Sequence, residues 1–493
     1  MAELEMKNWL SQRAFLTPDR TALVFENRDW TYRELNESVE SIARKLLKRG
    51  LEKGQHIGFL MDNHPDTIIL LHAFHLIHVV AVPLNKRLSE SELDYQLHDA
   101  EVDWLIVDVA HLEKAQRLRF GKIVTMMEIK EVNETNTELD KVIYLGNLHS
   151  IIFTSGTTGY PKGVMLTFGN HWWSATGSAL NLGIRNDDCW LCAVPLFHVS
   201  GLSIVMRSVI YGIPMVLHRT FEPVAFNESI YKEGVTIASV VSVMLSKALD
   251  SDNFRPYPGG FRCMLLGGGP APFPLLKRCE VNNIPVFQTY GLSESASQIV
   301  TLAPEDSFRK LGSAGKPLFP SQVKIVSGEG DGTSLEGEIF VKGPNVTQGY
   351  FNKHDINAEK IQDGWLATGD VGYLDDDGFL YVLDRRNDMF ISGGENVYPA
   401  EIEACLLGHE TVAEAGVIGI DDAVWGKVPA AFVVLKDPDV SEEALIQYCK
   451  EHLASYKVPK IVRFIKVLPR NASNKILRKD LHSLLEEGDE NAD

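Results

Sequence analysis

Short apolar runs alternate with helical patterns along most of the chain. Runs at 57–61, 79–83 and 105–107 are rich in branched apolar residues, and segments of helical periodicity separate them. The same alternation recurs with apolar runs at 151–154, 190–194, 215–217, 238–241, 263–266 and 286–289. Because strands that alternate with helices are typical of βα units, this pattern predicts a mostly parallel sheet covered by helices.

Near the start of the chain, the pattern defines one helix in detail. Thr31 and Glu34 have the spacing of a capping box, and apolar residues follow at helical intervals. Gly50 then offers a conformation that ends a helix. These signals predict a helix over 32–48.

The most apolar stretch of the chain, 67–84, does not have the pattern of a membrane span. It contains His72, His75 and His78 and ends next to Pro83, whereas a span needs about 20 consecutive apolar residues. We expect a buried helix that runs into a strand, with the histidines as helix and core residues.

The pattern changes in the last third of the chain. Over about 310–384, Gly-rich β segments replace the helical periods and predict a small β subdomain. A charged stretch at 385–388 precedes a region of mixed helices and strands, 389–493. The expected fold class is therefore α/β: a large N-terminal domain, 1–384, of βα-layered subdomains plus the β subdomain, then a hinge and a small α+β C-terminal domain. Residues from Glu486 onward are acidic and predict a solvated tail.

Composition restricts the class of protein further. A chain of 493 residues exceeds the roughly 250–300 residues that one hydrophobic core supports, so at least two domains are expected. A net charge of −18 argues against general binding to nucleic acids or anionic membranes.

The N-terminus lacks the pattern of a signal peptide and six cysteines are too few for a disulfide framework, so we expect a cytoplasmic protein. Cys189 and Cys192 have CxxC spacing without a second pair, which favours core packing over a zinc or redox site.

The strongest local signal is a Gly-rich segment, TSGTTGYPKG, at 154–163. Its glycines permit close approach of the backbone, its hydroxyls offer hydrogen bonds and Lys162 supplies a cation, so the segment suits a triphosphate. It is not a Walker A loop, because the lysine follows a proline and precedes a glycine. Taken alone, the segment leaves a flexible surface loop as the alternative.

The order of several motifs identifies a family. TSGTTGYPKG is followed by YGLSE (290–294), TGD (368–370), Arg385 and Lys475, and this series resembles the acyl-adenylate-forming superfamily of acyl-CoA synthetases, adenylation domains and luciferases. The resemblance covers essentially the whole chain. Within the superfamily, the segments 170–183, 261–272, 288–302 and 384–403 look most like the o-succinylbenzoate–CoA ligases of menaquinone biosynthesis. The resemblance implies that an acyl-adenylate forms from ATP and is then converted to a CoA thioester, with Mg²⁺ as cofactor.

The resemblance also implies roles for residues of an ATP site. Glu294 matches the family's Mg²⁺ ligand, and a hard cation prefers such an oxygen. Asp370 and Arg385 match the residues that bind the ribose hydroxyls, and Tyr290 matches the aromatic contact of adenine. Without the family, Glu294 and Asp370 would be interpreted as a helix-start residue and a turn residue. The expected ATP-binding residues are Thr154, Ser155, Gly156, Thr157, Thr158, Lys162, Gly268, Gln288, Tyr290, Gly291, Ser293, Glu294, Asp370, Arg385 and Lys475.

Lys475 matches the catalytic lysine of the family, which the C-terminal domain places between the substrate carboxylate and the α-phosphate. It lies in a segment from Lys460 to Asp480 with a net charge of +6. A solvated basic face explains most of these charges, and only Lys475 is assigned to chemistry. The family usually has glycine at the position of Asn474, and asparagine tolerates the left-handed backbone angles that glycine adopts.

The resemblance implies that the C-terminal domain is mobile. In the family this domain rotates after adenylation and presents a Gly-rich loop, here Gly393 and Gly394, to the CoA tunnel. The pivot is usually aspartate or lysine, whereas this chain has Asn387. We expect this difference to affect the rate of the rotation rather than its existence.

The acyl pocket is expected to include His198, Gly269 and Ser293. The surrounding segments, such as 238–245, are small and hydroxyl-rich, which suits a compact aromatic acid with a second polar group better than a fatty chain. The pocket composition alone does not distinguish 2-succinylbenzoate from other aryl acids. Other interpretations are a different aryl acid–CoA ligase, an adenylation enzyme that loads a carrier protein, and a non-catalytic nucleotide-binding regulator. A homo-oligomer is also left open.

Overall fold

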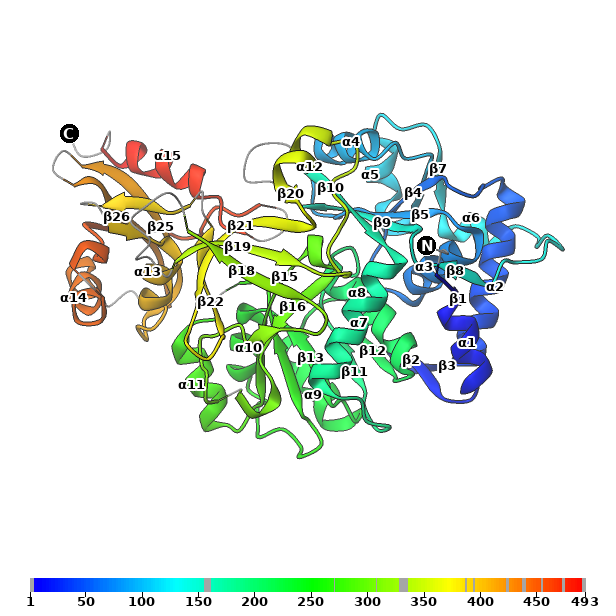
Figure 1. Cartoon of the computed structure of the whole chain (residues 1–493), viewed down its shortest axis with the longest axis horizontal. Helices are drawn as coiled ribbons and strands as arrows, with labels where there is room; N and C mark the ends of the chain where they lie inside the picture. Colours follow the sequence, from blue (N-terminus) through cyan, green and yellow to red (C-terminus); the bar gives the residue numbers. More distant parts are fainter. Residues whose placement is uncertain are drawn as a thin grey trace.

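A computed structural model describes most of the chain (Figure 1). The described residues are 4–154, 161–269, 271–306, 308–327, 336–385, 388–392, 395–422, 425–436, 440–453, 455–471 and 475–489. Among them, none of the helices is both long enough and apolar enough to cross a membrane.

The first βα units build a six-stranded sheet. Its strands, in spatial order, are β10 (Lys162–Thr167), β9 (Leu148–Thr154), β5 (Val80–Pro83), β4 (His56–Leu60), β6 (Trp104–Val107) and β7 (Ile123–Thr125). The helices of these units are α2 (Tyr32–Arg49), α3 (Pro65–Ile77), α4 (Glu90–Asp99), α5 (Leu112–Gln116) and α6 (Met126–Glu131). All neighbouring strands pair in parallel except the hairpin of β9 and β10. The predicted βα alternation is thus confirmed here.

Later βα units build a nine-stranded sheet with a parallel centre. Its order is β17 (Lys316–Pro317), β16 (Ser297–Thr301), β15 (Val286–Leu292), β14 (Cys263–Leu266), β13 (Ile237–Val240), β11 (Trp190–Cys192), β12 (Met215–Leu217), β2 (Thr21–Phe25) and β3 (Arg28–Thr31). The accompanying helices are α1 (Trp9–Leu16), α7 (Phe168–Leu182), α8 (Val199–Tyr211), α9 (Pro223–Lys232), α10 (Ser242–Leu249) and α11 (Phe273–Val281). Near the N-terminus, β1 (Glu5–Lys7) pairs with β8 (Val142–Tyr144).

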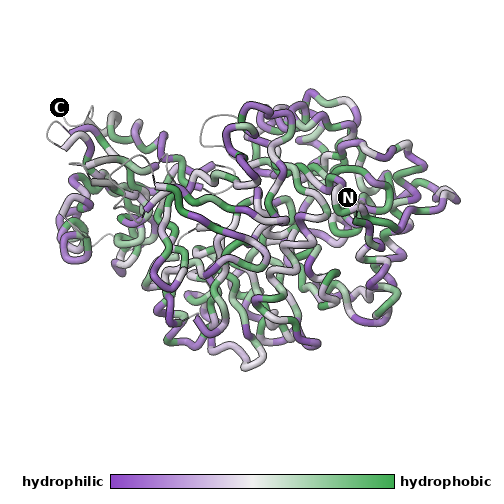
Figure 2. The backbone as a smooth tube through the Cα atoms, viewed as in Figure 1, coloured by the Kyte–Doolittle hydropathy of each residue, from purple (hydrophilic) through white to green (hydrophobic). Residues whose placement is uncertain are grey.

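The strands therefore form two sheets, where the pattern predicted one. Apolar runs that are buried on both faces look alike in either sheet, so the pattern does not show how strands are divided. Residues of both sheets share one hydrophobic core, with Phe59 and Trp190 among its largest buried side chains. In Figure 2, hydrophobic stretches follow the central strands and hydrophilic stretches lie mainly on outer helices and loops.

The predicted helix near the start is confirmed as α2. The Thr31 hydroxyl accepts a hydrogen bond from the Glu34 backbone, and the Glu34 carboxylate accepts one from the Thr31 backbone at 2.8 Å. Gly50 ends the helix with a φ of 96°. This helix forms as predicted because its cap, its apolar face and its stop are all local signals.

The last third of the chain adds two smaller sheets. The first contains β18 (Gln322–Val326), β19 (Gly337–Lys342), β21 (Trp365–Leu374), β20 (Ile361–Gln362) and β22 (Leu380–Arg385), with α12 (His354–Lys360) beside it. The second contains β24 (Glu395–Val397), β23 (Phe390–Ser392), β26 (Gly426–Leu435), β25 (Val412–Asp422) and β27 (Ile461–Phe464), with α13 (Pro399–Leu406), α14 (Glu442–His452) and α15 (Arg478–Asp489). This second unit lies at the left of Figure 1. The residues expected to form a solvated tail begin within a helix, because α15 continues to Asp489.

Candidate active site

The two ends of the predicted phosphate segment belong to antiparallel strands at the edge of the six-stranded sheet. Thr154 ends β9 and lies opposite Lys162, which begins β10. At Gly163 a Cβ would lie 2.6 Å from the Ile151 side chain, so the tight hairpin requires glycine. Thr154 and Lys162 therefore lie side by side on neighbouring strands. The predicted residues Ser155, Gly156, Thr157 and Thr158 lie outside the described residues.

Three residues expected to bind adenine and ribose come together where the nine-stranded sheet meets the first small sheet. The Tyr290 hydroxyl donates a hydrogen bond to Asp370 Oδ2 at 2.7 Å. Asp370 and Arg385 are cross-strand partners on β21 and β22, although they are distant from Tyr290 in sequence. Next to Tyr290, a Cβ on Gly291 would lie 1.7 Å from the Ser297 carbonyl oxygen, so the close approach of β15 and β16 excludes any side chain there.

The carboxyl end of β14, which pairs with β15, carries two more of the predicted residues, Gly268 and Gly269. Gly268 has a φ of +87°, which favours glycine, and a Cβ there would lie 3.0 Å from Val241 Cγ1. At Gly269 a Cβ would meet nothing within 4 Å, so this face is open. Gln288 on β15 is buried, and its Nε2 has no hydrogen-bond partner among the described residues. A buried amide donor without a protein partner fits a ligand acceptor such as a nucleotide.

Glu294 lies in a short turn, Ser293–Ser295, directly after β15. Its backbone carbonyl accepts a hydrogen bond from the Thr347 amide at 2.7 Å, and the Thr347 hydroxyl donates to the Met165 carbonyl of β10. This link holds Glu294 next to the phosphate hairpin. A half-buried carboxylate in that place is the donor that a hard cation such as Mg²⁺ prefers, so the residues fit the implied metal.

His198 and Lys475 belong to different parts of the chain but influence each other. His198 begins α8, and burial lowers its pKa to about 4, with further contributions from the positive charges of Lys475 and Arg87. The positive charge of Lys475 is thus close enough to His198 to affect its pKa. A histidine with this pKa is neutral at pH 7 and adds no charge of its own.

The loop that carries Lys475 is closed on itself. The Lys475 amide donates to Asn471 Oδ1 at 3.0 Å, and the Asn471 amide donates to the Lys475 carbonyl at 2.9 Å. On either side of this loop, Arg470 pairs with Glu414 at 2.6 Å and Arg478 pairs with Asp388 at 2.7 Å and with Glu403 at 2.9 Å. The prediction of a solvated basic face is therefore wrong for Arg470 and Arg478, whose charges are matched by acids distant in sequence. The predicted Asn387, Gly393, Gly394 and Asn474 lie outside the described residues.

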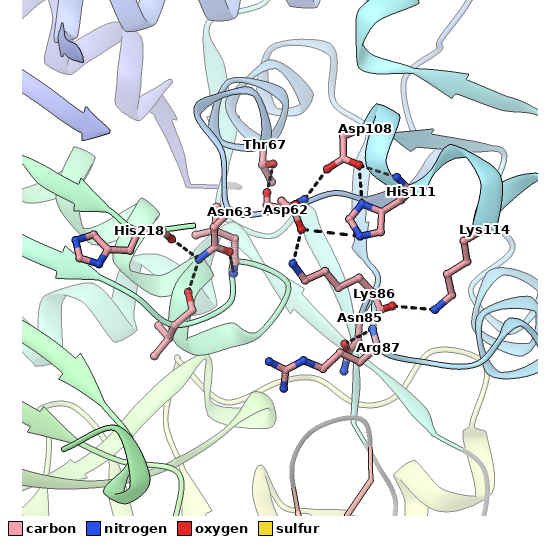
Figure 3. Close-up of polar contacts among 12 residues, drawn as sticks. Asp62, Asn63, Thr67, Asn85, Lys86, Arg87, Asp108, His111, Lys114 and His218 are labelled. Carbon is pink, nitrogen blue, oxygen red and sulfur yellow. Dashed lines mark hydrogen bonds and ion pairs between the residues drawn. The ribbon is translucent and has the colours of Figure 1, made fainter. Parts of the chain in front are cut away.

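The carboxyl ends of β4 and β5 carry polar residues that the sequence analysis missed (Figure 3). Asn63 donates from Nδ2 to the carbonyls of Val194 and His218, and its Oδ1 accepts from the Leu196 amide at 2.9 Å. Asn63 therefore fastens the six-stranded sheet to the loop that precedes His198. The sequence signal was present, because Asn63 and Arg87 follow apolar strand runs and such strand ends meet at one edge of a parallel sheet.

A group of three possible metal ligands lies beside Asn63. Asp62, Asp108 and His111 form the one such group among the described residues. Lys86 already donates to Asp62, and Asp108 Oδ2 accepts a hydrogen bond from the Asp62 amide at 2.9 Å. Because the Lys86 ammonium supplies the positive charge, this group is explained without a metal ion.

Four further histidines, here called the four-histidine group, are buried in the core. The group consists of His72, His75, His149 and His171. Their rings follow one another at centroid distances of 5.2, 4.8 and 4.4 Å, and the Nε2 atoms of His75 and His149 are 2.9 Å apart. The prediction that His72 and His75 are helix and core residues is confirmed. His78 is instead the end of α3 and pairs with Asp140 at 2.8 Å.

The two Cys of the CxxC spacing are buried, as the core-packing prediction required. Burial raises the pKa values of Cys189 and Cys192 to about 12. A thiol with such a pKa is a poor metal ligand or nucleophile at neutral pH, because both roles need the thiolate.

The fold and site are those of an adenylate-forming enzyme. The chain belongs to the AMP-binding enzyme family: the family's model matches residues 10–351, and the model of its C-terminal domain matches residues 401–475. The 2-succinylbenzoate–CoA ligase of Geobacillus sp. is 53% identical over 489 residues, which cover 98% of each chain.

The chain is also similar to solved structures of one bacterial CoA synthetase. The o-succinylbenzoate CoA synthetase of Bacillus subtilis, in complex with its acyl-adenylate intermediate, is 48% identical with a TM-score of 0.91, over 97% of this chain and 98% of that one. Its complex with ATP and magnesium ion is 47% identical, also with a TM-score of 0.91, over 97% and 100% of the two chains. A double mutant bound to a product analogue is again 48% identical, over 97% and 98%, but with a TM-score of 0.76.

Proposed function

We propose that the chain joins 2-succinylbenzoate to CoA, with conversion of ATP to AMP and pyrophosphate, in menaquinone biosynthesis. The observation that carries the proposal is that the charge of Lys475 contributes to the lowered pKa of His198, which supports a position of the implied catalytic cation near the expected acyl pocket. Identity of 53% to a 2-succinylbenzoate–CoA ligase over nearly the whole length supports the choice of acid.

The first half-reaction needs positive charge in this place. A carboxylate that attacks the α-phosphate meets another anion, and at 4 Å the repulsion is about 4 kcal/mol at an effective dielectric of 20. Lys475 is proposed to neutralise both groups with its ammonium, and Lys162, at the start of β10, is proposed to bind the phosphates. Mg²⁺, when bound through Glu294, supplies further positive charge against the phosphate oxygens. Asp370, Arg385 and Tyr290 are proposed to hold the nucleoside.

The second half-reaction needs access for a thiol rather than a strong base. A thiol with an unperturbed pKa of about 8.5 is already partly ionised near pH 8. The C-terminal domain is proposed to rotate, to withdraw Lys475 and to present Gly393 and Gly394 to CoA. The fall in TM-score from 0.91, for the adenylate complex, to 0.76, for the product-analogue complex, at equal identity supports two arrangements of the domains.

A pyrophosphate-release assay tests the proposal. With ATP, Mg²⁺ and 2-succinylbenzoate, the protein is expected to release pyrophosphate and, with CoA, to form the thioester. Release only with another aryl acid would contradict the substrate, and transfer only to a carrier protein would contradict the role of CoA. A cytoplasmic location is part of the proposal, supported by six cysteines that are all free.

A further inference from the structure

The carboxylate of Glu294 has one oxygen already engaged by the protein. The Tyr350 hydroxyl donates a hydrogen bond to Glu294 Oε1 at 2.8 Å. Oε2 accepts no hydrogen bond from the part of the chain that the structure describes. Tyr350 is buried, and the Lys162 ammonium lies 5.7 Å from the centre of its ring. One aromatic side chain thus contacts both the implied metal ligand and a lysine of the phosphate hairpin.

The position of Tyr350 is fixed by its backbone. Its amide donates to Asn357 Oδ1 at 2.7 Å, and its carbonyl accepts from Asn357 Nδ2 at 2.8 Å. A Cβ on Gly349 would lie 2.7 Å from Asn357, so only glycine allows this clamp. On the other side, Tyr350 forms a backbone bridge with Val164 of β10. The hydroxyl is therefore held in place before any ligand binds.

The hydrogen bond from Tyr350 to Glu294 affects which divalent cation the carboxylate binds best. Mg²⁺ demands near-octahedral geometry and binds carboxylates through single oxygens, whereas Ca²⁺ accepts two oxygens of one carboxylate in a looser shell. With one lone pair of Oε1 engaged by Tyr350, Oε2 is the oxygen that Glu294 offers more readily to a cation. We propose that Tyr350 is a positioning residue that keeps Glu294 monodentate and so makes nucleotide binding at this site prefer Mg²⁺ over Ca²⁺. The inference deepens the proposed function, because it rests on Glu294 as the metal ligand.

The test is Tyr350→Phe, in which the ring still fills its space and only the hydroxyl is lost. ATP binding is measured by calorimetry with Mg²⁺ alone and with Ca²⁺ alone, which requires no turnover. In the variant, the ratio of ATP affinity with Mg²⁺ to ATP affinity with Ca²⁺ is expected to fall about tenfold, which is the scale of one hydrogen bond to a charged group. A preference that stays within twofold of the unmodified protein overturns the inference, as does ATP binding by the unmodified protein that does not depend on the divalent cation.

A matched control is Tyr231→Phe, which also removes a bonded hydroxyl. Tyr231 donates to the Arg255 carbonyl at 2.6 Å, far along the chain from Glu294. This variant is expected to keep the full Mg²⁺ preference, and an equal loss in both variants would show a general effect of packing and overturn the inference.

A double mutant separates positioning from packing. In a Glu294→Gln background the charged ligand is gone, so Tyr350→Phe is expected to change the cation preference no further; a further change of several-fold overturns the inference. The outcome is independent of the substrate. Absence of pyrophosphate release with every acid would contradict the proposed function while the cation preference still tests the role of Tyr350.

Discussion

The four-histidine group and His198 differ in the origin of their neighbours. The four-histidine group packs within one core, against Trp9 and Phe168, and burial lowers the pKa of each member. Burial also lowers the pKa of His198, but one of the nearby cations, Lys475, comes from the other end of the chain. Burial alone therefore does not distinguish His198 from the four-histidine group, whereas the charge of a lysine from the far end of the chain does.

The largest expected effect comes from the removal of that cation. Lys475→Ala is expected to slow adenylation by at least about 10²-fold, because one preorganised charge at the reacting groups is lost. Thioester formation from preformed acyl-adenylate is expected to stay largely intact. Pyrophosphate release and single-turnover thioester formation measure the two steps, and equal losses in both would contradict a lysine that serves only the first step.

Removal of His198 has a smaller expected effect. His198→Ala is expected to lower kcat/KM for the acid about tenfold, the scale of a lost contact in a substrate pocket. With a pKa of about 4, His198 stays neutral from pH 6 to pH 8. The pH profile of kcat/KM in that range should therefore have the same shape in the variant; a limb that disappears would show that His198 titrates during the reaction.

The four-histidine group is expected to affect stability instead of rate. The pKa values of His72 and His171 are about 4 and about 3 in the folded chain, below the value of about 6.5 for an unfolded histidine. Below pH 6.5 the unfolded chain thus binds more protons, so the free energy of unfolding falls as the pH falls, by about 1.4 kcal/mol per pH unit for each such histidine.

Denaturant unfolding between pH 7 and pH 4.5 measures this slope. The double variant His75→Phe and His149→Val removes two members of the group and is expected to flatten the slope while pyrophosphate release at pH 7.5 is retained. Replacement of the exposed His482 by Gln is the control, and it should leave the slope unchanged. An unaltered slope in the double variant would exclude the group as the origin of acid sensitivity.

The smallest expected effect is a change in the pKa of His198, which tests the difference between His198 and the four-histidine group. In Lys475→Ala the pKa of His198 is expected to rise, because a nearby positive charge is lost, while the pKa of His171 should not change. Titration followed by NMR of labelled histidines measures both. A pKa of His198 that does not rise would contradict a position of Lys475 close to His198.

Local signals explain which features the sequence predicted well. The α2 helix has its cap, apolar face and stop within 20 residues, and the hairpin glycine Gly163 lies in a short motif. The partners of Arg470 and Arg478, in contrast, are Glu414, Asp388 and Glu403, more than 50 residues away. The pattern did not predict these ion pairs, because the residues next to an arginine in sequence do not show whether a distant acid pairs with it.

The sequence by itself determined the order of the βα units and the Gly-rich segment and, through the family motifs, predicted Glu294, Asp370 and Lys475 as site residues. Only the tertiary structure decided that the strands form two sheets, that Asn63 fastens one sheet to the loop before His198, and that Tyr350 engages one oxygen of Glu294. The physical reason is range: helix caps and glycine turns act over a few residues, whereas hydrogen bonds between distant segments depend on how the whole chain packs.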